Sequence, residues 1–84
     1  MKKTKVIFRK AQNPFTKNWD IVAFFPETYN DGYMTCYEHV GQHSEAHITF
    51  YWNTKKAMPE EYERLYNELT ESGYNLQVMQ RMQY

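Results

Sequence analysis

The stretch that decides the fold runs from Gly32 to Asn53 and reads GYMTCYEHVGQHSEAHITFYWN. Apolar and polar side chains alternate over 33–40 and again over 47–53, and this alternation predicts two β-strands. The polar residues 41–46 predict the loop that joins these strands. Because the stretch holds all three histidines and the only cysteine, we expect any functional site to lie here.

The alternation also assigns side chains to the two faces of the predicted strands. Successive side chains of a strand point to opposite faces, so Met34 and Cys36 share one face of the first strand. We expect this face, with the Phe and Trp side chains of 47–53, to pack inward beneath a helix. The opposite face is then expected to carry tyrosines and histidines: Tyr33, Tyr37, His39, His47 and Tyr51.

The residues before this stretch predict two further strands. KVIFRK at 5–10 predicts a short strand, and 11–18, which contains an Asn-Pro pair, predicts a loop. WDIVAFF at 19–25 is nearly all apolar, as expected of a central strand that is covered on both faces. The Asp-Gly pair at 31–32 predicts a turn, because glycine tolerates a positive φ.

Residues 58–72 predict the main helix. Four apolar side chains recur there with helical spacing and form one stripe: Tyr62, Leu65, Tyr66 and Leu69. Pro59 fits the first helical position, where its missing N–H costs nothing, and Gly73 fits the position after the end. Met58 is a poor N-cap, because its side chain has no oxygen to accept from the free N–H groups. NLQVMQRM at 75–82 predicts a last strand.

These segments predict an α+β fold. The expected architecture is a two-layer sandwich in the order β-β-β-β-α-β, with a mainly antiparallel sheet and one helix packed on one face. A chain of 84 residues predicts a single domain, 1–84. One helix covers only one face of such a sheet. We therefore expect the second face to be solvated, paired with another copy or used for binding.

The composition restricts the functional classes. Ten basic and ten acidic residues give a net charge of zero, so no general attraction to nucleic acid or anionic lipid is expected. Six basic residues precede Asp20, the first acidic residue, and seven glutamates follow residue 37, which predicts a charge dipole. One cysteine excludes an internal disulfide, and no apolar run approaches the roughly 20 residues that span a bilayer. A cytoplasmic protein without membrane contact is expected.

The histidines raise a metal site as one alternative. Cysteine and histidine side chains that can bind zinc are spaced C-x2-H-x3-H-x3-H at Cys36, His39, His43 and His47. On a strand, Cys36 and His39 point to opposite faces, so the four side chains cannot all converge. The alternative that stays open is a small metal-dependent or hydrolytic enzyme centred on His39, His43 and His47. Otherwise the histidines form hydrogen bonds within the loop and on the polar face, and neither a metal nor a cofactor is expected.

Nucleophilic catalysis has two candidate nucleophiles, Cys36 near His39 and Ser44 beside His43. Each would also need an orienting acid and oxyanion donors. Cys36 is expected to point into the core, away from His39, and Ser-Glu pairs are common in loops. The sequence therefore favours a protein without catalytic residues.

A second alternative is the binding of single-stranded nucleic acid. The basic residues 2–10 beside Tyr33, Tyr37 and Tyr51 have the composition of a stacking platform with phosphate contacts. The same lysines also fit a solvated edge strand, where they discourage pairing with another chain. The zero net charge favours the edge-strand interpretation, so nucleic acid is not the expected partner.

The leading interpretation is a protein-binding face. Amphipathic patches that are rich in tyrosine are typical of protein–protein contacts. The tyrosines would supply contact area, while Gln42 and His43 in the 41–46 loop would supply directional hydrogen bonds. The predicted binding residues, for a protein partner or for a second copy in a homodimer, are Tyr33, Tyr37, His39, Gln42, His43, His47 and Tyr51.

Several segments together resemble a known group of proteins. They are VIFRK at 6–10, IVAFFPE at 21–27, HVGQH at 39–43, PEEYERLYNEL at 59–69 and SGYNLQV at 72–78. The chain is similar over nearly its whole length to small uncharacterised proteins encoded by bacteriophages and mobile elements of gut bacteria. That group usually has Thr or Ser before Pro-Glu-Glu-Tyr, where this chain has Met58. The resemblance implies a cytoplasmic accessory protein that acts on a host or phage protein, and it carries over no catalytic residues.

Overall fold

The computed structural model describes residues 3–38 and 43–79 of the chain. The strands in these ranges are β1 (Thr4–Gln12), β2 (Trp19–Phe24), β3 (Tyr33–Tyr37), β4 (His43–His47), β5 (Lys55–Lys56) and β6 (Leu76–Val78). The helices are the single 3-10 turn η1 (Pro26–Thr28), the short helix α1 (Ile48–Trp52) and the main helix α2 (Pro59–Glu71).

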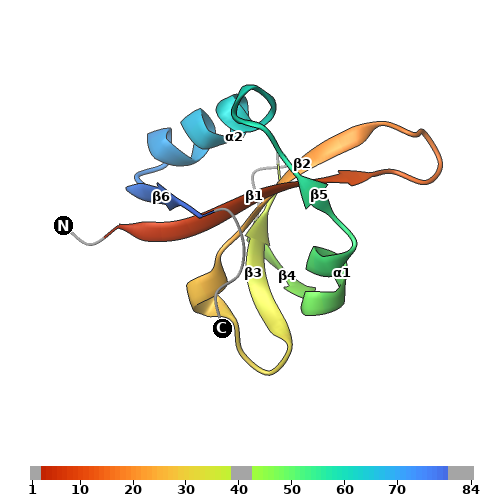
Figure 1. Cartoon of the computed structure of the whole chain (residues 1–84). Coiled ribbons are helices and arrows are strands. Elements are labelled where there is room, and N and C mark those ends of the chain that lie inside the picture. The colour runs from red at the N-terminus through yellow and green to blue at the C-terminus, as the bar shows by residue number, and fades with distance from the viewer. Residues whose placement is uncertain (1–2, 39–42, 80–84) are drawn as a thin grey trace.

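The described strands form one six-stranded sheet in the order β4-β3-β2-β1-β5 (Figure 1). β6 pairs in parallel with the first residues of β1, and the other strand pairs are antiparallel. The predicted α+β class, with a mainly antiparallel sheet and a main helix across one face, is confirmed.

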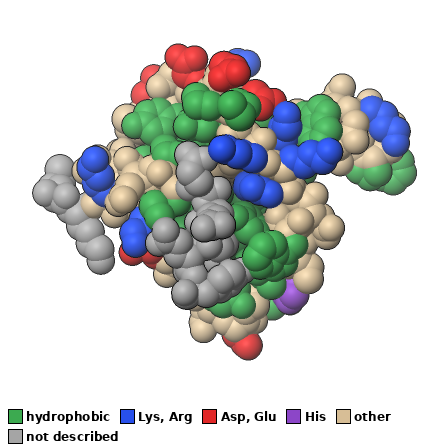
Figure 2. Space-filling view, viewed as in Figure 1, with side chains coloured by type: hydrophobic (Ala, Val, Ile, Leu, Met, Phe, Trp, Pro, Cys, Tyr) green, Lys and Arg blue, Asp and Glu red, His purple; other side chains and the backbone are tan. Residues whose placement is uncertain are grey.

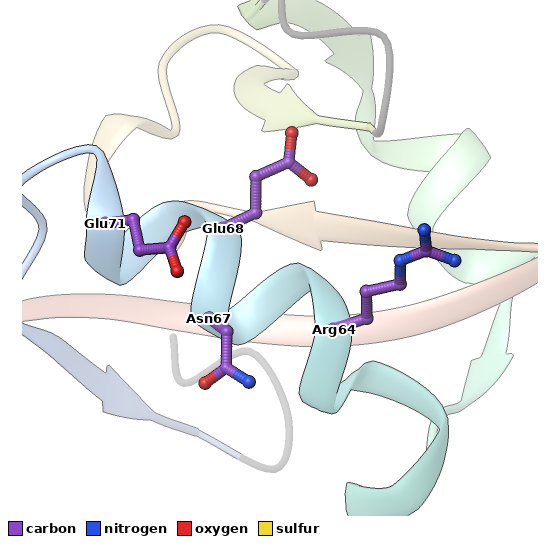
Figure 3. Close-up of a pocket in the computed structure, with 4 residues that line it drawn as sticks. All are labelled: Arg64, Asn67, Glu68 and Glu71. Carbon is purple, nitrogen blue, oxygen red and sulfur yellow. The ribbon is translucent and has the colours of Figure 1, made fainter.

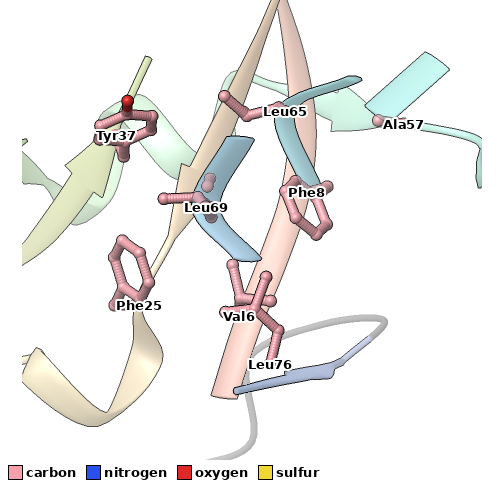
Figure 4. Close-up of a cluster of buried hydrophobic side chains, with 9 residues drawn as sticks. Val6, Phe8, Phe25, Tyr37, Ala57, Leu65, Leu69 and Leu76 are labelled. Atoms are coloured by element: carbon pink, nitrogen blue, oxygen red, sulfur yellow. The ribbon is translucent and has the colours of Figure 1, made fainter. Parts of the chain in front are cut away.

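α2 lies where the sequence predicts it. Its first residue is Pro59, the backbone of Met58 before it is extended, and Gly73 after it has a φ of +106°. Leu65 and Leu69 are fully buried against the sheet. They belong to one apolar cluster (Figure 4), which contains Val6, Phe8, Ala23, Phe25, Tyr37, Ala57, Leu65, Leu69 and Leu76.

None of the helices found in 3–38 and 43–79 has the length and apolarity needed to cross a membrane.

A second apolar cluster lies on the opposite face of the sheet. It contains Ile7, Val22, Phe24, Met34, Cys36 and Tyr51. Tyr51 comes from α1, and its ring meets the Phe24 ring edge-on with the two centroids 5.3 Å apart. The Arg9 guanidinium lies 5.0 Å from the centroid of the Tyr51 ring and donates to the Thr54 carbonyl at 2.7 Å. The expectation of an open second face is therefore wrong where α1 covers it, because the chain buries this face with its own residues.

The strand predicted for 47–53 is also wrong, because Ile48–Trp52 form α1. A short apolar run is too brief for its period to separate a strand from a helix. The chain changes from strand to helix at His47. The backbone of His47 is still extended, and its Nδ1 accepts the Thr49 N–H at 3.2 Å. This hydrogen bond satisfies one of the free N–H groups at the start of α1.

The loop predicted for 41–46 is wrong for residues 43–46, which belong to β4 and pair with β3. Residues 41–42 lie outside the described residues. The strand predicted for 33–40 ends at Tyr37, and its residues 39–40 are also outside the described part.

β1 and β2 continue past the body of the molecule as a projecting hairpin (Figure 1). The strand predicted for 5–10 extends to Gln12, which pairs with Trp19, and Ala11 pairs with Asp20. We call residues 9–22 the β1–β2 arm. Its loop, 13–18, lies at the far end of the hairpin.

Candidate functional site

The β3–β4 hairpin brings tyrosines and histidines together in register. Tyr33 pairs with His47, and Tyr37 pairs with His43. Residues two apart on a strand share a face, and cross-strand partners share that face as well. The four side chains therefore form two Tyr-His pairs on one face of the hairpin, separated by the pair of Thr35 with Glu45.

One of these pairs is held against the C-terminal half of α2. The Tyr37 side chain is only 5% exposed, and its hydroxyl donates to Glu68 Oε1 at 2.9 Å. This hydrogen bond is the main reason why the pKa of Tyr37 is raised above its usual value. The His43 ring lies 4.9 Å from the Tyr37 ring, and its Nε2 is hydrogen-bonded to the Tyr74 hydroxyl at 2.7 Å.

Aromatic rings surround His43 on the side that faces the core. The Phe25 and Tyr74 rings stack with their centroids 5.5 Å apart, and the Phe25 centroid lies 5.9 Å from that of His43. These contacts fix the first residue of β4 to the segment that follows α2. Tyr74 could not be predicted from the sequence as part of this site, because a partner 31 residues away in the chain leaves no local pattern.

The other pair lies at the turn end of the hairpin and is exposed. Tyr33 is 50% exposed, and its ring meets the His47 ring edge-on at 5.0 Å. The hydrogen bond from the Thr49 N–H fixes the His47 ring. Gly32 has a φ of +87°, and a Cβ at this position would lie 3.2 Å from His47 Nε2. The turn glycine therefore leaves the space that the His47 ring needs.

β4 is an outer strand of the sheet. Within residues 3–38 and 43–79 it pairs with β3 and with no other strand. Its side chains are exposed except for Ala46, which is half-buried. A free strand edge offers backbone N–H and C=O groups to an added strand. We define the β3–β4 surface as Tyr33, His43, His47 and the outer edge of β4.

A polar hollow of about 680 Å³ lies on α2 (Figure 3). Its lining residues are Arg64, Asn67, Glu68 and Glu71. Glu68 connects the hollow to the sheet, since it accepts the hydrogen bond from Tyr37. Among the described residues, those that line the hollow all come from α2, and they include charges of both signs.

The structure does not form the single tyrosine face that the sequence predicts. Tyr51 is 2% exposed and belongs to the second apolar cluster, on the opposite face from Tyr37. Tyr37 itself is buried beneath the helix, so only Tyr33 of the three predicted tyrosines is exposed. His39 and Gln42 lie outside the described residues.

The metal-site alternative conflicts with the position of two of its histidines. His43 and His47 are the two ends of one extended strand, so their backbones are about 13 Å apart. Side chains at that separation cannot both bind one ion at the roughly 2 Å that zinc requires. The described part of the chain contains no group of three or more possible metal ligands.

Cys36 also lacks the features of a catalytic nucleophile. Its side chain is 4% exposed, and its Sγ lies 3.3 Å from Ser44 Oγ across the hairpin. Burial raises the pKa of the Cys36 thiol, although the contact with Ser44 partly offsets this. The reactive species of cysteine is the thiolate, which a raised pKa disfavours at neutral pH. The prediction that Cys36 points into the core is confirmed.

Comparisons of this chain with protein-family models, with curated proteins and with solved structures find no match.

Proposed function

We propose that this chain is a non-catalytic interaction protein that binds another protein through the β3–β4 surface. The observation that carries this proposal is the exposed Tyr33-His47 pair beside the edge of β4 that no strand of the described ranges pairs with. An added strand from a partner gains main-chain hydrogen bonds at such an edge, and pockets between alternate side chains give selectivity. Tyrosine is enriched in such contacts, because it offers a large apolar ring together with a polar group.

The hairpin is held in place before any partner binds. His43 is hydrogen-bonded to Tyr74 at one end, and His47 accepts from Thr49 at the other end. A surface that is already ordered loses less conformational entropy on binding. This favours recognition over catalysis. The Thr49 hydroxyl does lie 2.9 Å from His47 Nδ1, but the Thr49 N–H donates to the same nitrogen, so this contact serves the start of α1.

The resemblance to small proteins of bacteriophages and mobile elements supports an accessory role in the cytoplasm of a host cell. The partner in this proposal is a host protein, a phage protein or a second copy of the chain. Affinity capture from host lysate identifies a foreign partner, and sedimentation velocity of the pure chain detects self-association.

The test compares Tyr33→Ala with the control variant Tyr29→Ala, because Tyr29 is 41% exposed but lies outside the β3–β4 surface. Tyr33 is the hot spot of this surface in the proposal, and truncation of a hot-spot residue costs about 2 kcal/mol or more, so we expect at least a roughly tenfold loss of affinity for Tyr33→Ala. The Kd for the purified partner, or for the self-association, is measured by calorimetry or sedimentation. Equal Kd values for the two variants would contradict the proposal.

A further inference from the structure

The β1–β2 arm is a second surface that the proposed function does not use. Phe15, in the loop of the arm, is 92% exposed to solvent. The loop is ordered by its own hydrogen bonds, since Asn13 Oδ1 accepts the Phe15 N–H at 2.8 Å and the Thr16 N–H at 3.2 Å. Gln12 Nε2 also donates to the Lys17 carbonyl at 3.0 Å. The Phe15 ring is thus presented at the end of a fixed hairpin.

The base of the arm concentrates positive charge around a second aromatic ring. β5 pairs with β1 so that Lys55 lies opposite Lys10 on the face of Trp19, whereas Lys56 lies opposite Arg9 on the other face. The ammonium groups of Lys10 and Lys55 lie 5.2 and 5.7 Å from the centroid of the Trp19 ring, which is 43% exposed. Like charges directly opposite each other in a ladder are destabilising. An anionic ligand would relieve this repulsion.

Cationic side chains outnumber acidic ones in the arm and β5. The arm and β5 together carry five cationic side chains and one acidic side chain, Asp20. Lys10 makes a salt bridge with Glu61 at 2.9 Å, whereas Lys17, Lys55 and Lys56 are exposed. Figure 2 shows Lys and Arg side chains gathered over β5 and the arm, and Asp and Glu gathered over α2. The chain therefore has a cationic region at the arm and β5 and an acidic region at α2, although its net charge is zero.

We infer that the β1–β2 arm binds single-stranded nucleic acid. Lys17 and Lys55 contact phosphates, and an unstacked base lies on the Phe15 ring. This combination of aromatic rings with a basic track is the usual basis of single-strand binding without sequence preference. An acidic protein segment would also neutralise the lysines, but every nucleotide of a single strand offers a base that can stack on the Phe15 ring.

A single strand fits this arm better than a duplex does. An apolar side chain can enter a duplex only by unstacking a base step, which costs free energy. Proteins that do so make many phosphate contacts, whereas the arm and β5 together offer only three exposed lysines in the described part of the chain. The bases of a single strand are accessible for stacking without that cost.

The number of lysines sets the expected salt dependence. Each phosphate neutralised on a single strand contributes about −0.7 to the slope of log K against log salt concentration, so two contacts give a slope of about −1.4. The measurement is fluorescence anisotropy of a labelled oligo-dT of about 12 nucleotides, titrated with the full chain at several salt concentrations. We expect saturable binding that weakens with this slope.

Variants separate the two parts of the site. Loss of one base–aromatic stack typically weakens binding roughly 5- to 150-fold, so we expect this loss for Phe15→Ala. Lys55→Gln should reduce the magnitude of the salt slope by about 0.7. Tyr29→Ala removes an exposed aromatic ring elsewhere, and Arg64→Gln removes a cation from α2. Both controls should bind like the unmodified chain.

Several outcomes would overturn the inference. They are no saturable binding at low salt, equal affinity of Phe15→Ala and the unmodified chain, tighter binding of a duplex of the same length, and displacement of the oligonucleotide by poly-glutamate at equal charge. Tyr33→Ala should leave oligonucleotide binding unchanged, so this test and that of the β3–β4 surface fail independently.

Discussion

At the scale of single residues, the Tyr37 hydroxyl determines how the hairpin is attached to α2. We expect Tyr37→Phe to lower the free energy of unfolding by about 1 kcal/mol at pH 8, because the ring stays in place and only the hydrogen bond to Glu68 is lost. The free energy of unfolding is measured by urea denaturation monitored by circular dichroism. An unchanged midpoint at pH 8 would show that this hydrogen bond contributes nothing net.

The same bond gives a pH dependence whose sign follows from the pKa of Tyr37. The hydrogen bond to Glu68 raises this pKa in the folded state, so the neutral phenol is the form that the fold stabilises. The contribution is fully present below the unfolded pKa of about 10 and is lost as the pH rises through the folded pKa. The difference in stability between the unmodified chain and Tyr37→Phe should therefore shrink above pH 10, and a difference that grows would contradict this assignment.

At the scale of elements, α2 could be predicted from the sequence and α1 could not. α2 repeats its apolar stripe over thirteen residues, between a proline and a glycine that suit its two ends. α1 has five residues, and its Ile48 and Tyr51 fit a helix while alternate residues also fit a strand. Its conformation depends on contacts from elsewhere, such as the Ile48 N–H that donates to the Gly32 carbonyl at 2.7 Å. Such contacts are invisible to a local pattern.

The N-terminus of α2 is the element that a single substitution can improve. Met58 makes no side-chain hydrogen bond at the N-cap, although its N–H donates to Glu61 Oε1 at 2.9 Å. In Met58→Thr the hydroxyl can accept the Glu60 N–H, because the Glu61 N–H already donates to the carbonyl of residue 58 at 2.8 Å. We expect a gain of about 1 kcal/mol, which corresponds to a rise of roughly 4–8 °C in Tm.

The control for this prediction is Met58→Ala, which removes the same side chain but supplies no acceptor. Thermal denaturation of the three proteins should place Met58→Thr above the unmodified chain and Met58→Ala at or below it. A Tm for Met58→Thr that does not rise would show that the free N–H groups at this helix start are already satisfied.

At the scale of the whole molecule, the sequence predicts which residues share a face but not which face lies under α2. The alternation of Tyr37 with Cys36 is as predicted, yet the two sets lie on the faces opposite to those expected. The cross-strand register determines which face of the sheet lies under α2. Phe8 pairs with Ala23, and Ala23 pairs with Tyr37, so all three lie on one face. Phe8 stacks on Tyr62 of α2 at 4.3 Å, which places this face beneath the helix.

For the candidate site, too, the residue types could be predicted from the sequence, but their arrangement in space could not. The Tyr33-His47 pair depends on the register of β3 with β4, which the misplaced loop at 41–46 concealed. The cationic region also depends on the fold, because β5 brings Lys55 and Lys56 beside a strand more than 40 residues earlier in the chain. Residue types at these positions were visible in the sequence, but their proximity arises only from the arrangement of the sheet.

The division into two apolar clusters leads to a prediction for the pair Tyr37 and Tyr51. Each is almost fully buried, and they lie on opposite faces of the sheet in separate clusters. Truncation of a buried aromatic residue to alanine typically costs about 3–5 kcal/mol, and substitutions without shared neighbours add. The double variant should therefore lose about 6–10 kcal/mol, which is close to the total stability expected for a chain of this size.

We thus expect Tyr37→Ala and Tyr51→Ala each to remain folded with a lower urea midpoint, and the double variant to be largely unfolded at 25 °C by circular dichroism. Tyr33→Ala is the matched control and should change the stability by no more than about 0.5 kcal/mol, because half of that side chain is exposed. A double variant that stays folded and loses only the ability to bind a partner would mean that the two tyrosines form an exposed face after all. That result would contradict the division of the core into two layers, because burial in separate clusters requires both rings to stabilise the fold.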